Sequence, residues 1–201
     1  MSNMYLTEKY IQEEIIYLKN RINKIDDITT KYDLIYLYAS PILENGRESN
    51  APISYLEEIR IILKLIEKSK KKFNCKFECI DKDVLTKVIS RNKTKILHIS
   101  GHGIYDENYY LVVENLKKNG ENQDININNL KLILNEGKTN LSHMDLVIIS
   151  TCYSEDFAQE FIKLGVKNLI YIKKLTEVID DISVVFVEYF YKYLIEGKTI
   201  E

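Results

Sequence analysis

The sequence predicts an α/β domain built on a mainly parallel sheet with helices on both of its faces. Short apolar runs rich in β-branched residues alternate along the chain with longer segments in which apolar residues recur every three or four positions. The strand-like runs are apolar almost throughout, which is typical of strands covered on both faces. The 201 residues are enough for one such domain with a full core.

The first half of the chain shows this alternation clearly. The expected elements are a strand at 32–39, a helix from Pro52 to about Lys71, a strand at 74–80, a short helix at 83–91 and a third buried strand at 95–100. Pro52 suits the first position of a helix because that position needs no backbone N–H. The acidic Asp83 suits the start of the short helix because it complements the helix dipole.

The second half continues the pattern around a polar loop rich in Asn and Lys. The expected elements are a strand at 109–113, a helix at about 128–136, a fourth core strand at 145–150, a helix at 155–164, a fifth strand at 168–172 and a final helix at about 177–195. Gly137 and Gly165 are suited to end the two helices before them. We expect the final helix to bury Ile182, Val185, Phe186, Tyr189 and Tyr193.

Residues 1–28 form a separate expected element, an amphipathic helix that precedes the domain at 32–201. Its apolar residues recur at alternating spacings of four and three, at Ile11, Ile15, Leu18, Ile22 and Ile25. About two heptads are too few for a self-standing coiled coil. We expect this helix either to pack on its own domain or to connect the domain to an upstream regulatory or scaffold region.

Charge and hydropathy argue against two classes of partner. The chain carries 28 Lys and Arg against 30 Asp and Glu, so it offers no basic face for nucleic acid or for an anionic membrane. The basic run at 68–72 lies at a helix end, where cations complement the dipole. No apolar run is long enough to span a bilayer, and the polar amino terminus does not resemble a signal peptide. We expect a soluble, cytoplasmic protein.

The three cysteines do not indicate a disulfide framework or a zinc ribbon. Cys75 and Cys79 flank a predicted strand and are expected to be core thiols in a reducing compartment. His98 and His102 could bind a metal ion together with Cys152, but no fourth ligand cluster is visible. We therefore expect no metal, and only Cys152 lies in a context that suggests chemistry.

Two small polar segments, each directly after a buried strand, carry that chemistry. The third strand leads into Gly101-His-Gly103, and the fourth leads into Thr151-Cys-Tyr-Ser154. The carboxyl ends of parallel strands form one edge of a sheet, where ligands bind in open α/β folds. If the strand order is 2-1-3-4-5, the two strands are neighbours and His102 faces Cys152. Such a pair is what a cysteine nucleophile with a general base requires.

Two other chemistries fit these segments less well. Gly101-His-Gly103 follows the third strand and has Asp106 where a dinucleotide-binding loop needs its third glycine. Ser150 and Ser154 are not part of the Gly-x-Ser-x-Gly elbow of serine hydrolases. We expect no organic cofactor.

The motifs around the two residues resemble those of a known family. His98-Ile-Ser-Gly-His-Gly103 and Ile148-Ile-Ser-Thr-Cys-Tyr-Ser154 resemble the two catalytic motifs of CHAT domains, a branch of the caspase-like cysteine peptidases that also lies near separase. The histidine precedes the cysteine by about fifty residues, as in caspases. The resemblance covers roughly 32–201, including Phe161–Ile170 and the acidic start and aromatic residues of Asp180–Tyr193.

The resemblance implies a fold and an activity. It implies a caspase-like three-layer sandwich with a mainly parallel central sheet flanked by helices. It implies a cysteine endopeptidase that hydrolyses peptide bonds of a protein substrate, with Cys152 as nucleophile and His102 as base. The backbone N–H groups of Gly103 and Cys152 would then form the oxyanion hole. No third, orienting residue stands out, so the expectation is a dyad.

The same resemblance places Ser150 and the neighbourhood of Asp180 in the substrate-binding pocket. If Asp180 reaches the pocket, it would favour a basic substrate residue through a charge-assisted hydrogen bond. Alternatively, Asp180 is an N-cap or first-turn residue of the last helix and only stabilises that helix.

Two further alternatives remain open at the level of sequence. The domain could be a catalytically latent or inactive member of the fold that acts as a protein-interaction module. The Gly-Lys-Thr segment at 197–199 leads into further helix in the family. We therefore expect either an unusually compact member or a domain of a longer protein.

Overall fold

The structure is a computed structural model of the chain, and it describes residues 31–41, 43–44, 47–48, 53–69, 71–91, 93–115, 121–135, 140–174 and 176–199. Residues 31–201 form one compact unit. The helix expected within 1–28 and the expected helix start at Pro52 lie outside the described residues.

A sheet of five strands, all parallel, forms the centre of this unit. The strands are β1 (Lys31–Tyr38), β4 (Cys75–Cys79), β5 (Lys93–Ser100), β9 (Leu146–Ser150) and β10 (Leu169–Tyr171). They lie in the order β10-β9-β5-β1-β4, and each neighbouring pair is parallel. In chain order this is the arrangement 2-1-3-4-5. The central strands have runs of fully buried residues, as their continuous apolar sequences predict.

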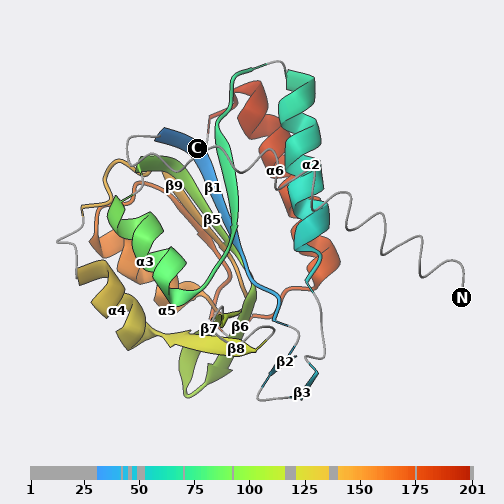
Figure 1. The fold of residues 1–201 in the computed structure, drawn as a ribbon. Coiled ribbons are helices and arrows are strands. Elements are labelled where there is room, and N and C mark those ends of the chain that lie inside the picture. The colour runs from blue at the N-terminus through green and yellow to red at the C-terminus, as the bar shows by residue number, and fades with distance from the viewer. Residues whose placement is uncertain are drawn as a thin grey trace, which may run out of the picture. The chain divides into compact units, whose positions relative to one another are not determined.

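Helices cover both faces of the sheet, which gives three layers (Figure 1). One face carries α2 (Tyr55–Ser69) and α6 (Asp180–Glu196), and the other carries α3 (Lys82–Arg91), α4 (Ile127–Asn135) and α5 (Glu155–Lys163). The predicted fold class, a caspase-like sandwich with a mainly parallel central sheet, is confirmed. No helix among the described residues is long and apolar enough to cross a bilayer.

The two faces of the sheet differ in chemistry because side chains alternate along each strand. On β5, Leu97 and Ile99 belong to the main hydrophobic core together with residues of α3, α4 and α5. His98 and Ser100 are buried but lie outside that core, and His98 bonds to a side chain of α6.

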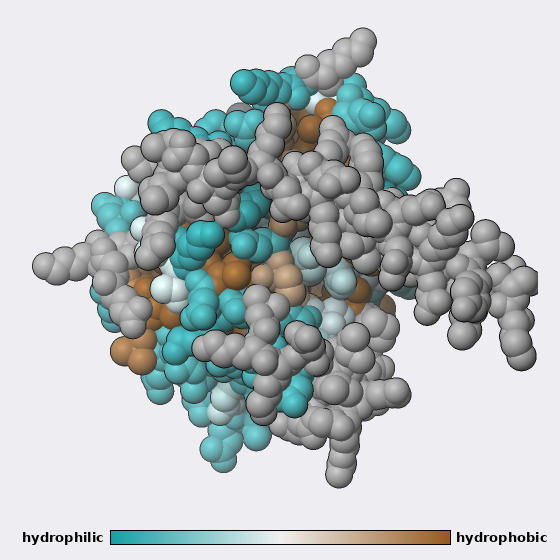
Figure 2. Space-filling view, viewed as in Figure 1, coloured by the Kyte–Doolittle hydropathy of each residue, from teal (hydrophilic) through white to brown (hydrophobic). Residues whose placement is uncertain are grey.

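In Figure 2, hydrophilic residues cover much of the described surface on the viewed face, with smaller hydrophobic areas between them.

A second, antiparallel sheet lies beyond the carboxyl ends of the main strands (Figure 1). It consists of β6 (His102–Asp106), β7 (Asn108–Glu114) and β8 (Asn122–Asn126), in the order β6-β7-β8. The strand β7 agrees with the sequence prediction. No element was assigned to the segment of β6, and the segment of β8 was expected to be part of a polar loop, which is wrong. They are short and mostly not buried, so pairing with β7 rather than an apolar pattern makes them strands.

The final helix also differs from the prediction. It begins at Asp180 rather than near 177, and its buried residues are Val187, Tyr191 and Ile195. Four of the five residues that were expected to be buried are exposed instead, namely Ile182, Val185, Tyr189 and Tyr193. The helix carries apolar residues on several sides, so the sequence period alone did not identify the stripe that faces the sheet.

Candidate functional site

A pocket at the carboxyl ends of β5 and β9 brings the two predicted chemical residues together. The register pairs Ser100 with Ser150, so both strands end at the same level. The chain then turns through Gly101 into β6, whose first residue is His102, and through Thr151 to Cys152. His102 and Cys152 line one pocket, and both are half-buried.

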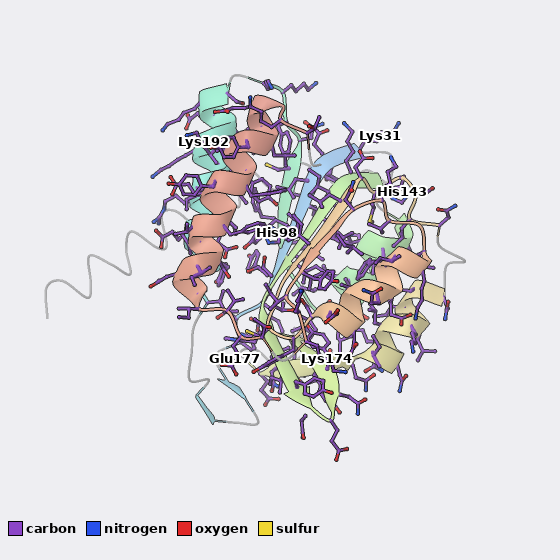
Figure 3. All side chains as sticks on the ribbon, turned by 180° about the vertical axis from the view of Figure 1, so that it is seen from behind. Lys31, His98, His143, Lys174, Glu177 and Lys192 are labelled. Atoms are coloured by element: carbon purple, nitrogen blue, oxygen red, sulfur yellow. The ribbon has the colours of Figure 1, made fainter. Side chains whose placement is uncertain are left out.

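Figure 3 shows which end of the sheet this is. Lys31 starts β1 and His143 lies just before β9, and both mark the amino ends of the strands. Lys174 and Glu177 follow β10 and lie at the opposite end. The pocket itself has a volume of about 70 Å³. Small-molecule sites usually have hundreds of Å³, so this pocket is small by comparison and of a size for a single side chain.

Gly103 lies against the main chain of Cys152. A Cβ atom placed on Gly103 would be 2.1 Å from the Cys152 carbonyl oxygen and 2.9 Å from the ring of Tyr109. No real Cβ tolerates such contacts, so only glycine fits at position 103. The two loops that carry His102 and Cys152 are thereby held in direct backbone contact. A Cβ on Gly101 would instead meet its nearest neighbours at 3.6–3.8 Å, an ordinary contact distance.

Tyr109 on β7 lies next to this contact and bonds to the residue before Cys152. Its hydroxyl is hydrogen-bonded to the Thr151 hydroxyl at 2.6 Å, and its ring packs against Phe157 of α5. Burial raises the pKa of Tyr109, so the phenol stays protonated and can keep this bond. The sequence analysis missed Tyr109, because nothing in an apolar strand marks one buried tyrosine as a neighbour of a distant loop.

Cys152 lies on a sharp turn between strand β9 and helix α5. Tyr153, directly after it, has φ 58°, the left-handed region that side chains other than glycine seldom adopt. The Ser154 hydroxyl donates to the Ile149 carbonyl at 3.2 Å and accepts from the Ile172 N–H at 3.0 Å. These bonds fix the turn, and α5 starts at Glu155. A negative charge near this helix start is favoured by the helix dipole.

The segment that leads into α6 contacts the sulfur of Cys152. The Val178 N–H donates a hydrogen bond to Sγ at 3.4 Å. The thiol in turn donates to the Val178 carbonyl oxygen, with 3.9 Å between Sγ and that oxygen. Next to this contact, the Tyr153 N–H donates to the Thr176 carbonyl at 3.3 Å. The thiol therefore lies between the turn after β9 and the main chain just before α6.

Ser150, predicted to bind substrate, lines the pocket and is tied to a buried histidine. The Ser150 hydroxyl lies 2.9 Å from Nε2 of His98, and Nδ1 of His98 lies 2.9 Å from the Tyr191 hydroxyl. Burial lowers the pKa of His98 to about 3, so the ring is neutral near pH 7. Both ring nitrogens of His98 therefore have partners. Figure 3 shows His98 between α6 and the sheet. Among the described residues, no group of three potential metal ligands is found.

Asp180 combines parts of both alternatives that the sequence left open. It is the first residue of α6, but the N-cap is Ile179, which makes no side-chain cap bond. The Asp180 carboxylate instead accepts the Ser54 N–H at 3.0 and 3.2 Å, just before α2 begins. Asp180 also lines the pocket. It thus joins the starts of two helices while remaining at the pocket wall.

Glu58 on α2 is a pocket residue that the sequence analysis missed. Its side chain is fully buried, Oε2 accepts a hydrogen bond from the Tyr36 hydroxyl, and Oε1 has no hydrogen-bond partner. The pKa of Glu58 is raised to about 7, chiefly by burial. The hydrogen bond with Tyr36 opposes this rise in pKa, and the negative charge of Asp180 adds to it. A side-chain hydrogen bond with Ser100 has the smallest effect and also opposes the rise. A glutamate in the first turn of a helix is ordinary, so no local pattern marks Glu58 as a pocket residue.

The contact at Gly103 predicts a sharp difference between two glycine variants. Gly103→Ala should displace the loop of His102 or that of Cys152 and destabilise the fold by about 1–3 kcal/mol, the usual cost of overpacking. Gly101→Ala should cost less, because its Cβ meets only ordinary contacts. Thermal unfolding of both variants measures the difference. Equal melting temperatures would contradict the contact as described.

Glu58 and His98 predict opposing effects of pH on stability. His98 has a pKa of about 3 in the fold against 6.5 as its ordinary value, so stability falls as pH falls through this range. Glu58 has a pKa of about 7 against 4.5, so its folded form keeps a proton that the unfolded chain loses. Between pH 4.5 and 6.5 its contribution therefore falls as pH rises, and the two effects partly cancel.

Removing Glu58 should remove this cancellation. In Glu58→Gln, stability should rise with pH between 4.5 and 6.5 more steeply than in the wild type, by up to about 1.4 kcal/mol per pH unit. Urea unfolding at a series of pH values measures the slope. Glu57→Gln is the matched control, since Glu57 is the exposed neighbour on the same helix. An unchanged slope in Glu58→Gln would contradict the buried, protonated state of Glu58.

Comparison with known families agrees with the motifs at the two strand ends. A family model of the CHAT domain matches residues 41–201, a range that includes every residue that lines the pocket. A comparison with curated proteins gives no match. The family match spans most of the chain, and the three-layer fold agrees with it. This chain therefore belongs to the CHAT domain family of caspase-like cysteine peptidases.

Proposed function

We propose that the domain is a cysteine endopeptidase that cleaves a protein substrate with Cys152 as nucleophile and His102 as general base. The observation that supports it most is the shared pocket. Neighbouring parallel strands bring the imidazole and the thiol to one small pocket, and Gly103 lies against the carbonyl of Cys152. A nucleophile and a base on rigid strand ends are the arrangement that acyl transfer needs.

The reaction follows in two halves. His102 takes the thiol proton, and the sulfur attacks the carbonyl carbon of the scissile peptide bond. The oxyanion that forms accepts hydrogen bonds from the backbone N–H groups of Gly103 and Cys152, each worth about 3 kcal/mol of barrier. His102 then protonates the leaving amine, and an acyl-enzyme remains. In the second half, His102 deprotonates a water molecule that attacks the thioester, and the acid product leaves with the thiol restored.

Ser150 and Asp180 bind the substrate residue next to the scissile bond in this proposal. Both line the pocket beside Cys152. In this proposal the substrate backbone approaches Cys152 beside the main chain of Val178, which bonds to the sulfur. Substrate binding would therefore exchange the Val178 contact for contacts with the peptide, and the chemistry needs neither a metal nor an organic cofactor.

An upstream or partner region regulates the site in this proposal, acting through the apolar seam of Ile11–Ile25. The seam supports the idea because a heptad pattern of this length needs a surface to pack on. Deletion of residues 1–28 should then change the rate of cleavage or the binding of the partner while the domain stays folded. Cleavage and partner binding measured side by side on the full and shortened chains provide the test. Unchanged values for both would remove the seam from the mechanism.

The central prediction concerns Cys152→Ala. The variant should lose cleavage of a peptide library completely, since no other residue supplies the nucleophile. Its melting temperature should stay close to that of the wild type, because a small side chain at a half-buried turn is replaced by a smaller one. The assay measures cleavage by mass spectrometry and unfolding by calorimetry.

Cys75→Ala is the matched control, because Cys75 is another half-buried cysteine and lies in β4, at the amino-terminal start of that strand. It should keep full activity. Cleavage that persists in Cys152→Ala would overturn the proposal. A wild type that stays silent would favour the interaction-module alternative.

A further inference from the structure

The pocket beside Cys152 is lined by two acidic side chains. Glu58 and Asp180 both line it. No lysine or arginine lines it among the residues that the structure describes, and its other polar side chains include three serine hydroxyls, those of Ser100, Ser150 and Ser183. Two carboxylates in a pocket whose described lining has no lysine or arginine favour cations over anions and neutral groups.

Glu58 lies at the inner end of this pocket with unused bonding capacity. Glu58 and Ser100 are almost completely buried, whereas His102 and Cys152 at the other end are half-buried. Only Oε2 of Glu58 has a hydrogen-bond partner, and Oε1 is buried without one. Leaving a buried carboxylate oxygen unpaired is costly. A donor that enters with a ligand would remove this cost.

We propose that Glu58 is a specificity-determining residue which, with Asp180, binds the cationic side chain of a lysine or arginine on the acyl side of the scissile bond. The inference rests on the proposed peptidase function. In this proposal the long side chain of lysine or arginine enters beside Cys152 and places its charged donors at the buried end of the pocket, where Glu58 lies. An ammonium or guanidinium donates several charge-assisted hydrogen bonds, which neutral side chains cannot match.

Among the described residues, Asp180 is the charged group whose effect on the pKa of Glu58 is resolved. Tyr36 on β1 and Tyr191 on α6 are buried phenols whose pKa values are raised, so both are neutral. His98 on β5 packs against Tyr36 and is neutral as well. The pKa of Glu58 is raised to about 7, chiefly by burial. A bound cation therefore displaces a proton from Glu58, and the preference for cations should weaken below pH 7.

Four chloromethyl ketone tripeptides that differ only at the residue before the reactive group test the proposal. That residue is arginine, lysine, norleucine or glutamate, and the rate of covalent labelling of Cys152 is followed by intact mass spectrometry. The arginine and lysine reagents should label at least about 100-fold faster than the norleucine reagent, since charged hydrogen bonds contribute about 1.5–3 kcal/mol each. The glutamate reagent should be the slowest.

Variants identify the residue that is responsible. Glu58→Gln should reduce the preference for arginine over norleucine to about 10-fold or less. Asp180→Asn should reduce it by a smaller factor, because the Asp180 carboxylate is already engaged by Ser54. Glu57→Gln, on the exposed side of the same helix, should leave the preference unchanged. Circular dichroism of each variant shows whether it is folded.

The wild type offers a second readout that does not depend on any variant. The ratio of arginine to norleucine labelling cancels the pH dependence of the thiol and of His102. This ratio should fall between pH 8 and pH 5.5, by up to tenfold per pH unit below about pH 7. Labelling at equal rates by all four reagents, or a ratio independent of both pH and Glu58, overturns the inference and leaves the peptidase function standing. No labelling of Cys152 by any reagent overturns the peptidase function itself, and the inference with it.

Discussion

The pairing of β5 with β9 is the constraint on which the site depends. These strands are parallel neighbours in register, so the two loops that follow them leave the sheet at the same point. One loop carries His102 and the other carries Cys152. The absence of a side chain at Gly103 lets the loops approach until main chain meets main chain. A residue with a Cβ there would force them apart, whatever the rest of the sequence contained.

Hydrogen bonds from several elements hold the residues around this contact in place. Tyr109 reaches Thr151 from the small antiparallel sheet, and Ser154 bonds to Ile149 and Ile172. The left-handed Tyr153 gives the chain the sharp reversal between strand and helix. Serine hydrolases place their nucleophile on a comparable strand-to-helix turn with a glycine-rich motif. This chain makes such a turn without the Gly-x-Ser-x-Gly motif. It therefore shares with the serine hydrolases the geometry of the turn but not the sequence motif.

The two faces of the central sheet differ in the chemical character of their buried side chains. The face under α3, α4 and α5 is an apolar core and contributes mainly to stability. The face under α2 and α6 contains His98, Tyr36 and Glu58, whose burial is costly unless they are paired. His98 has partners at both ring nitrogens, whereas one Glu58 oxygen has none. Buried polar groups that remain unpaired beside a candidate nucleophile are a frequent sign of a functional site.

The sequence by itself determined the layers of the fold, the positions of the main strands, and the placement of His102 and Cys152 just beyond two of those strands. These features follow from local patterns, because apolar runs and their polar ends are properties of neighbouring residues. Only the tertiary structure decided which apolar stripe of α6 is buried, that β6 and β8 pair with β7, and that Tyr109 and Glu58 reach the site. Each of these depends on contacts between residues far apart in the chain. Residues with ordinary local roles, such as a glutamate in a first helical turn, acquire their chemical surroundings only when the layers pack together.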